Sequence, residues 1–130
     1  MKKLLTFLVL VAGLSRVAGP LYAHHGRGAT YDTKTVTWKV TITEVAWRNP
    51  HISFWGDVKD PTGKVVNWAF EGPNVSTLSR QGITRNTLKV GEELNVTFLP
   101  ARIGSPVGLF RGLTRLDGKQ IFSQDLNAVD

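Results

Sequence analysis

The sequence predicts a mainly β fold: a small OB-like Greek-key barrel of five to six strands, with one short helix between strands three and four. Three observations predict it: segments in which apolar and polar residues alternate, turn signals between them, and one helical pattern that interrupts the series. An open antiparallel sandwich is the alternative, because alternation does not reveal which strands pair. The 130 residues, 42% hydrophobic and 20% charged, have room for one domain.

The first predicted strand, residues 34–48, is long and changes phase. Apolar residues occupy every second position up to Ile42, and Val45 and Trp47 then continue one position out of step. Because successive side chains of a strand point to opposite faces, this phase change predicts a β-bulge near residues 43–44.

Two further strands, residues 51–59 and 65–71, flank a predicted turn at residues 60–63, where proline and glycine suit a turn. Their common apolar face is predicted to carry Ile52, Phe54, Val58, Val66, Trp68 and Phe70. The tryptophans Trp38, Trp47 and Trp68 all fall on apolar strand faces, so we expect all three in the core.

A short helix is predicted after the third strand. Asn74 suits its N-cap, Val75 and Leu78 lie three apart on one face, and Gly82 suits the left-handed position after its end. Three more strands follow, and the last two are joined by an Asp-Gly hairpin signal. They are predicted at residues 94–102, 107–116 and 119–122.

The first residues have the pattern of a targeting segment. Two lysines precede an apolar run of 11 residues, 4–14, which is too short for a membrane-spanning helix of about 20 residues. We expect a signal peptide at 1–23, an N-terminal arm at 24–33 and a single barrel domain at 34–130. This organisation predicts a periplasmic protein with no membrane span after cleavage; an uncleaved membrane anchor is the alternative.

The charge pattern argues against nucleic acid as a partner. The formal net charge is +6, but Lys2, Lys3 and Arg16 belong to the predicted signal peptide, which contains no acid. The remainder is therefore only +3, with its basic residues scattered, whereas nucleic-acid binding needs a clustered basic face. The chain has no cysteine, which excludes disulfides and thiolate ligands. No catalytic set is recognisable, so we propose no catalytic residue and expect a binding module rather than an enzyme.

Several short motifs stand out along the chain: Ala23-His24-His25, Trp47-Arg48-Asn49-Pro50-His51, Trp68 with Glu71-Gly72, residues 78–82 (L-S-R-Q-G), Thr84-Arg85 with Leu88, and Gly91-Glu92. Together they resemble a family of short exported bacterial proteins catalogued as domain of unknown function 6152. The chain departs from the family pattern at Val40, Ile83 and Val90, where glycine, tryptophan and proline are usual. The resemblance implies export and a small β domain, and it implies no reaction.

The three histidines, His24, His25 and His51, all fall within these motifs. Cleavage after residue 23 would make His24 the mature N-terminus, whose amine and ring Nδ1 form a chelating pair. A third nitrogen from His51 or His25 would suit Cu(II), in a local arrangement that resembles the histidine brace of some exported copper proteins. In the competing interpretation His24 and His25 are a frayed terminus and His51 caps a turn.

A second candidate site lies on the outer faces of strands two and three and the loop before them. OB-type domains often bind ligands there, so we predict that this surface holds a sugar, a peptide, a small anion or a partner protein. Its candidate residues are Arg48, Asn49, His51, Trp55, Asn67 and Glu71. In the competing interpretation Trp55 simply covers a barrel end or the helix.

Overall fold

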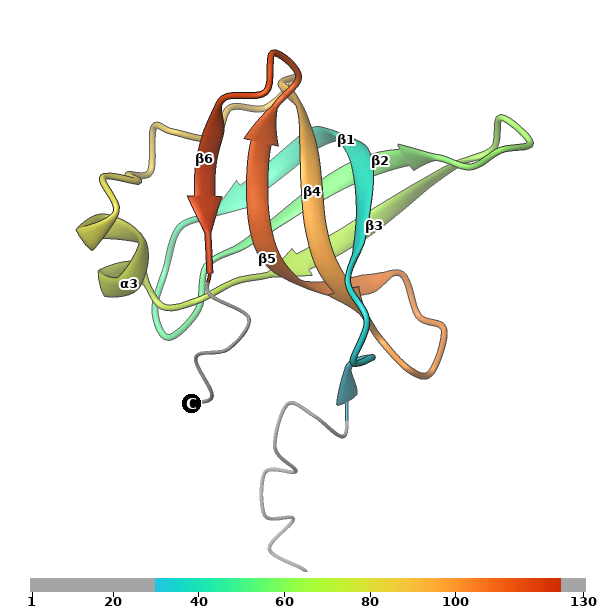
Figure 1. Ribbon diagram of the computed structural model, residues 1–130, viewed down its shortest axis with the longest axis horizontal. Helices are drawn as coiled ribbons and strands as arrows, with labels where there is room; N and C mark the ends of the chain where they lie inside the picture. Colours follow the sequence, from blue (N-terminus) through green and yellow to red (C-terminus); the bar gives the residue numbers. More distant parts are fainter. Residues whose placement is uncertain (1–29, 125–130) are drawn as a thin grey trace, which may run out of the picture.

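The structure is a computed structural model that describes residues 30–124. The predicted signal peptide, His24 and His25 lie outside the described residues. Within residues 30–124, six strands and one short helix follow one another (Figure 1). They are β1 (Val36–Ala46), β2 (Ser53–Lys59), β3 (Val65–Glu71), α3 (Val75–Arg80), β4 (Glu93–Pro100), β5 (Val107–Arg115) and β6 (Gln120–Ser123).

The strands form a closed barrel. Their order is β3-β2-β1-β4-β5-β6, and all of these neighbours are antiparallel. A parallel pairing of β3 with β5, from Ala69↔Val107 to Glu71↔Leu109, closes the first five strands on themselves. β6 adds a sixth strand beside β5 (Figure 1). This is the predicted OB-like barrel with its helix between strands three and four, and not an open sandwich.

β1 bends where the sequence changes phase. Its register with β2 shifts between Ile42, which pairs with Gly56, and Glu44, which pairs with Trp55, so the predicted bulge is confirmed. Gly56 allows the strands to approach here, because an added Cβ would lie 2.2 Å from Cγ1 of Val40. The bulge and the glycine together let one strand contribute to both sides of a small barrel.

Aromatic rings fill the interior. Phe54 and Phe70 stack with ring centroids 4.9 Å apart, and Phe98 meets Phe70 edge-on at 5.0 Å. Phe110 lies 5.4 Å from Phe54, and all four side chains are fully buried. The inward-facing residues predicted for β2 and the end of β3 are therefore confirmed as core.

Helix α3 forms as the sequence predicts. Asn74 is its N-cap, and its Oδ1 accepts a hydrogen bond of 2.8 Å from the backbone N–H of Thr77. Gly82 follows the C-cap with a φ of +77°, the left-handed conformation that glycine adopts without a steric penalty.

The helix and the loop after it plug one end of the barrel, on the left in Figure 1. Leu78 of the helix is completely buried, and Ile83 and Leu88 of the following loop join the same core cluster. Among residues 30–124, no helix is long and apolar enough to cross a membrane.

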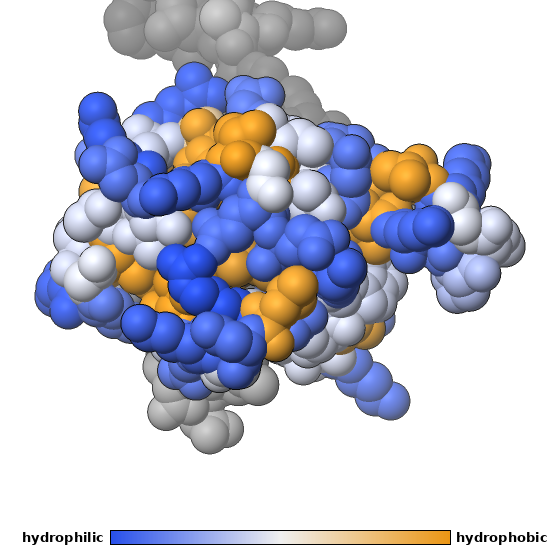
Figure 2. Space-filling view, turned by 90° about the horizontal axis from the view of Figure 1, so that it is seen from above, coloured by the Kyte–Doolittle hydropathy of each residue, from blue (hydrophilic) through white to orange (hydrophobic). Residues whose placement is uncertain are grey.

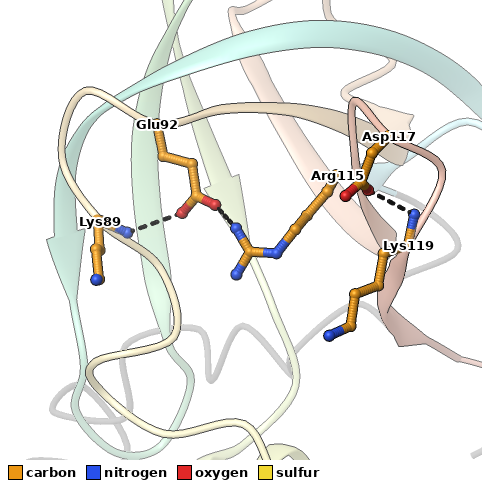
Figure 3. A network of polar contacts seen from close by, with 5 residues as sticks. All are labelled: Lys89, Glu92, Arg115, Asp117 and Lys119. Atoms are coloured by element: carbon orange, nitrogen blue, oxygen red, sulfur yellow. Dashed lines mark hydrogen bonds and ion pairs between the residues drawn. The ribbon is translucent and has the colours of Figure 1, made fainter.

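A polar contact ties the chain entering β4 to the β5–β6 hairpin (Figure 3). The Glu92 carboxylate pairs with the Arg115 guanidinium and accepts a hydrogen bond of 3.3 Å from the backbone N–H of Lys89. Within the hairpin, Oδ1 of Asp117 accepts from the backbone N–H of Lys119 at 2.9 Å. The Glu92–Arg115 pair therefore holds the turn before β4 beside the β5–β6 hairpin, and the other two bonds stabilise each turn separately.

Candidate functional site

The three tryptophans expected in the core differ in burial. Trp47 and Trp68 are half-buried and pack against the core cluster. The prediction is wrong for Trp38, which is 37% exposed. Alternation identifies the face to which a side chain points, but not how far along the strand the packed interior extends. Trp38 lies on the inward face of β1 at the end of the barrel opposite the helix.

The exposed tryptophan is firmly held. Its ring centroid is 5.0 Å from that of Trp68 in an edge-to-face contact, and also 5.0 Å from that of Phe98. Trp68 in turn lies 5.6 Å from Phe98. Such aromatic pairs stabilise one arrangement of the rings beyond the effect of buried area alone. The two tryptophans therefore form a fixed apolar platform at this end, which we call the barrel mouth.

An open groove of about 830 Å³ lies at the barrel mouth, a size typical of small-molecule sites. Its walls come from β1, the β2–β3 hairpin and the β4–β5 loop. The hairpin and the loop project on the right in Figure 1. Its apolar lining consists of Trp38, Val58, Pro61, Val66, Trp68 and Pro106. Figure 2 shows apolar side chains between hydrophilic ones on the projecting hairpin, to which Val65, 55% exposed, belongs.

Two lysines border the groove. Nζ of Lys39 lies 3.0 Å from Oε1 of Glu93, in an exposed ion pair on the outer side of the barrel. Lys59 has no carboxylate partner within residues 30–124. The mouth therefore combines an apolar floor with one positive charge that is not neutralised by a contact in this part of the chain.

Asp60 also borders the groove, but its carboxylate faces its own turn. Oδ1 accepts hydrogen bonds from the Oγ1 of Thr62 at 2.6 Å, from its backbone N–H at 2.8 Å, and from the N–H of Lys64 at 3.0 Å. The Thr62 hydroxyl, followed by backbone N–H groups of the turn, lowers the pKa of Asp60 below its usual 3.8. Asp60 is thus engaged in holding the tip of the hairpin.

The predicted outer face of β2 and β3 exists, and its polar groups bond to one another. Nδ2 of Asn67 donates to Oδ1 of Asp57 at 2.7 Å and to Oγ1 of Thr43 at 3.0 Å. Trp55 is half-buried on the same face, where it pairs with Glu44 of β1. The structure thus brings Trp55 and Asn67 onto one surface, as the alternation predicts.

Glu71 ends β3 and holds the segment before β1. The hydroxyl of Tyr31, which is only 7% exposed, donates to Oε2 of Glu71 at 2.9 Å. Tyr31 also pairs with Ala101, and its carbonyl accepts a hydrogen bond of 2.8 Å from Nε of Arg102. The end of the predicted N-terminal arm is therefore fixed against the barrel, a contact that no sequence pattern indicated.

The remaining candidates lie in the loop before β2. Arg48 and Asn49 are exposed, and His51 is half-buried. His51 lies two residues before Ser53, which pairs with Glu71, so the loop adjoins the outer face at its Glu71 end. Among the described residues, no three histidines or carboxylates cluster as metal ligands. The predicted metal set depends on His24 and His25, which lie outside this range.

Sequence reasoning missed the barrel mouth. The two prolines of its lining, Pro61 and Pro106, come from loops 45 residues apart, and their meeting depends on barrel closure. One signal was present: Trp38 lies near the start of β1, where a side chain on the inward face projects past the core.

Comparison with known proteins gives one match. A family model described as a family of unknown function, DUF6152, matches residues 12–111. No curated protein and no solved structure matches the chain. Because the matched residues cover most of the chain, including five of the six strands wholly or in part, the protein belongs to the family of unknown function DUF6152.

Proposed function

We propose that the protein is an exported, non-enzymatic β-barrel module that binds a small ligand or a segment of a partner protein at the barrel mouth. The observation that carries this proposal is the groove floored by Trp38 and Trp68. Binding sites are typically concave and mainly apolar, with a few polar groups that fix the orientation of the ligand, and barrel mouths are frequent locations. Export rests on the targeting pattern of residues 1–23.

The lining indicates the chemistry of the ligand. Trp38, Trp68 and the groove prolines offer flat apolar surfaces to an aromatic or aliphatic body. Lys59 offers an ammonium group to an anion at the border, and the Asp60 carboxylate is occupied by its own turn. A ligand with an apolar body and one negative charge fits this combination.

The outer face of β2 and β3 is the alternative location for the same function. Its aromatic group is Trp55, but the polar groups beside it bond to each other through Asn67, Asp57 and Thr43. A ligand there must compete with hydrogen bonds that already exist, whereas the apolar walls of the mouth gain contacts on binding. The mouth is therefore the better-supported location.

A fluorescence titration tests the location. The probe is 8-anilinonaphthalene-1-sulfonate, which is both apolar and anionic, added to wild type, Trp38→Ala and the control Trp55→Ala. We expect at least tenfold weaker binding for Trp38→Ala and unchanged binding for Trp55→Ala, with circular dichroism confirming that both variants are folded. Loss of binding in Trp55→Ala alone would move the site to the outer face, and no binding by wild type would contradict the proposal.

Copper binding by His24 with His51 or His25 is a second candidate, and the contact of Tyr31 favours it. His25 precedes Tyr31 by six residues, which span at most about 20 Å. Tyr31 bonds to Glu71, whose pairing partner Ser53 is two residues from His51. The contact therefore fixes Tyr31 against the end of β3 that pairs with the residues just after His51.

Copper is best tested on protein processed and purified from the periplasm, because a leftover methionine or tag would block the terminal amine. Cu(II) is added in an EPR titration of wild type and His51→Ala, after mass spectrometry of the N-terminus. Stoichiometric binding with nitrogen hyperfine structure that changes in His51→Ala supports the site. A start other than His24, or a spectrum indifferent to His51, rejects it.

A further inference from the structure

The edge of β3 is only partly covered. The parallel ladder between β3 and β5 begins at Ala69↔Val107, and the Ala69 N–H donates to the carbonyl of Pro106 at 2.9 Å. Before Pro106 the β4–β5 loop leads the chain back to β4, away from the position beside β3 that β5 occupies further along (Figure 1). The first half of β3, from Val65 to Trp68, thus has β2 on one side and no strand of residues 30–124 on the other.

The direction of the free backbone groups follows from the β2–β3 register. The N–H of Asp60 bonds to the carbonyl of Lys64, and the N–H of Gly72 bonds to the carbonyl of Ile52. In an antiparallel pair, hydrogen-bonded and non-hydrogen-bonded positions alternate. The backbone N–H and C=O groups of the even-numbered residues of β3 therefore point toward β2. The N–H and C=O groups of Val65 and Asn67 therefore point away from β2, and they have no backbone partner in the described chain.

This open edge runs beside the groove. The groove lining includes Val66 and Trp68, which alternate along β3 with Val65 and Asn67, the residues with free backbone groups. Side chains of an added strand would alternate in the same way as those of β3, so every second one would point into the groove. The backbone edge and the apolar groove therefore suit one occupant, an extended segment.

We infer that the barrel mouth takes an extended peptide segment of a partner protein, which adds as a strand to β3 at Val65–Trp68 and places an apolar side chain against Trp38 and Trp68. This inference rests on the proposed function and names its ligand class. Addition of a strand to a free sheet edge is a recurring mode of peptide recognition, in which backbone bonds give affinity and side-chain pockets give specificity.

Two lysine side chains of the hairpin, which form no ion pair within residues 30–124, offer ammonium groups to an acidic residue of the peptide. Lys59 and Lys64 flank the turn of the hairpin, and Asp60, the acid between them, is bonded to that turn. A second copy of the chain that paired its own β3 with this edge would bring no carboxylate from that strand before Glu71, so it lacks the charge complementary to these lysines. A peptide with a glutamate or aspartate beside its apolar residue has the complementary charge.

The test uses fluorescein-labelled, capped heptapeptides in which valine, leucine or phenylalanine alternates with threonine or glutamate, with a lysine-for-glutamate set as control. Binding is followed by fluorescence anisotropy and by competition with 8-anilinonaphthalene-1-sulfonate. NMR hydrogen exchange reports the protection of the Val65 and Asn67 amides. We expect the glutamate peptides to bind at least tenfold more tightly than the lysine peptides and to protect both amides.

Val65→Pro is the matched variant. It removes an N–H that points away from β2, so it leaves the β2–β3 ladder intact, and an edge position tolerates proline. We expect Val65→Pro to bind 8-anilinonaphthalene-1-sulfonate like wild type and to lose at least tenfold in peptide affinity. Methylation of every second backbone nitrogen of the peptide can be made in two patterns, offset by one residue. The pattern that methylates the nitrogens facing β3 should cause the same loss of affinity, and the other pattern should not.

The outcomes separate the inference from the proposed function. Binding of 8-anilinonaphthalene-1-sulfonate without binding of any peptide overturns the inference and leaves a small-molecule site. Peptide binding that is indifferent to Val65→Pro and to N-methylation also overturns it, since the backbone edge would then play no part. If the Val65 and Asn67 amides become protected when only the protein concentration is raised, the edge is occupied by a second copy of the chain. Binding of neither probe rejects the proposed function as well.

Discussion

The two ends of the barrel differ in how the chain covers them. At one end, α3 and the loop after it bring Leu78, Ile83 and Leu88 over the core, and all three are buried. At the mouth, the β2–β3 hairpin and the β4–β5 loop stand apart and leave Trp38 37% exposed beside an open groove. The apolar side chains of the plugged end therefore serve stability, whereas those of the mouth remain available to a ligand.

The difference begins in the sequence. After β3, residues 74–92 form a capped helix and an apolar loop before the chain returns to the sheet. The connection between β4 and β5 is only six residues, 101–106, with glycine, serine and proline and one apolar branched residue, Ile103, which is exposed. A segment of that length and composition cannot plug a barrel end.

The largest effect is expected at the plugged end. Leu78→Ala removes a completely buried side chain and leaves a cavity between the helix and the core, which should lower the free energy of unfolding by about 3 kcal/mol. Urea unfolding followed by tryptophan fluorescence measures it, with exposed Ser79→Ala as the control. A loss below about 1 kcal/mol would mean that the helix is not a plug.

A smaller effect is expected for Trp38→Ala in the same urea experiment. Its ring packs against Trp68 and Phe98 in edge-to-face contacts, but more than a third of the residue is exposed. We expect a loss of about 1.5 kcal/mol, together with the loss of probe binding described above. A stability loss equal to that of Leu78→Ala would break the comparison, because the mouth would then be part of the structural core.

The contact of Tyr31 with Glu71 should contribute less. Tyr31→Phe and Glu71→Gln each alter one hydrogen bond between a phenol and a carboxylate, so each should cost about 1 kcal/mol. The double variant should cost clearly less than the sum of the single variants, because the two changes affect the same bond. Additive losses would show that the two residues stabilise the barrel independently.

The sequence predicted most of the fold because local rules govern it. The bulge between Ile42 and Glu44, the cap at Asn74 and the left-handed Gly82 each follow from one residue type in one place. Strand limits differed only at their ends: β2 begins at Ser53 rather than 51, and β4 ends at Pro100 rather than 102.

The site was harder to predict because it depends on contacts distant in the chain. Trp38 and Pro106 meet at the mouth only after β3 and β5 close the barrel. The anchor between Tyr31 and Glu71 joins residues 40 apart and has no periodic signature. Alternation did place Trp55 and Asn67 on one face, but it could not show that Asn67 is already bonded to its neighbours.

The smallest effect is expected when acid protonates Asp60 in the β2–β3 hairpin, which forms one wall of the mouth. The Thr62 hydroxyl and backbone N–H groups lower the pKa of Asp60 below 3.8, so the ionised carboxylate is bonded more strongly in the folded protein. Its stabilisation is therefore fully present above pH 3.8 and is lost as the pH falls through the lower folded pKa. Hydrogen exchange of the Thr62 and Lys64 amides, followed by NMR from about pH 5 to about pH 2 and corrected for intrinsic rates, should show this loosening. In Asp60→Asn the pH dependence should disappear, and the Leu78 amide at the plugged end should not respond in either protein. Equal acid sensitivity at both ends would mean that the mouth and the plug open as one unit.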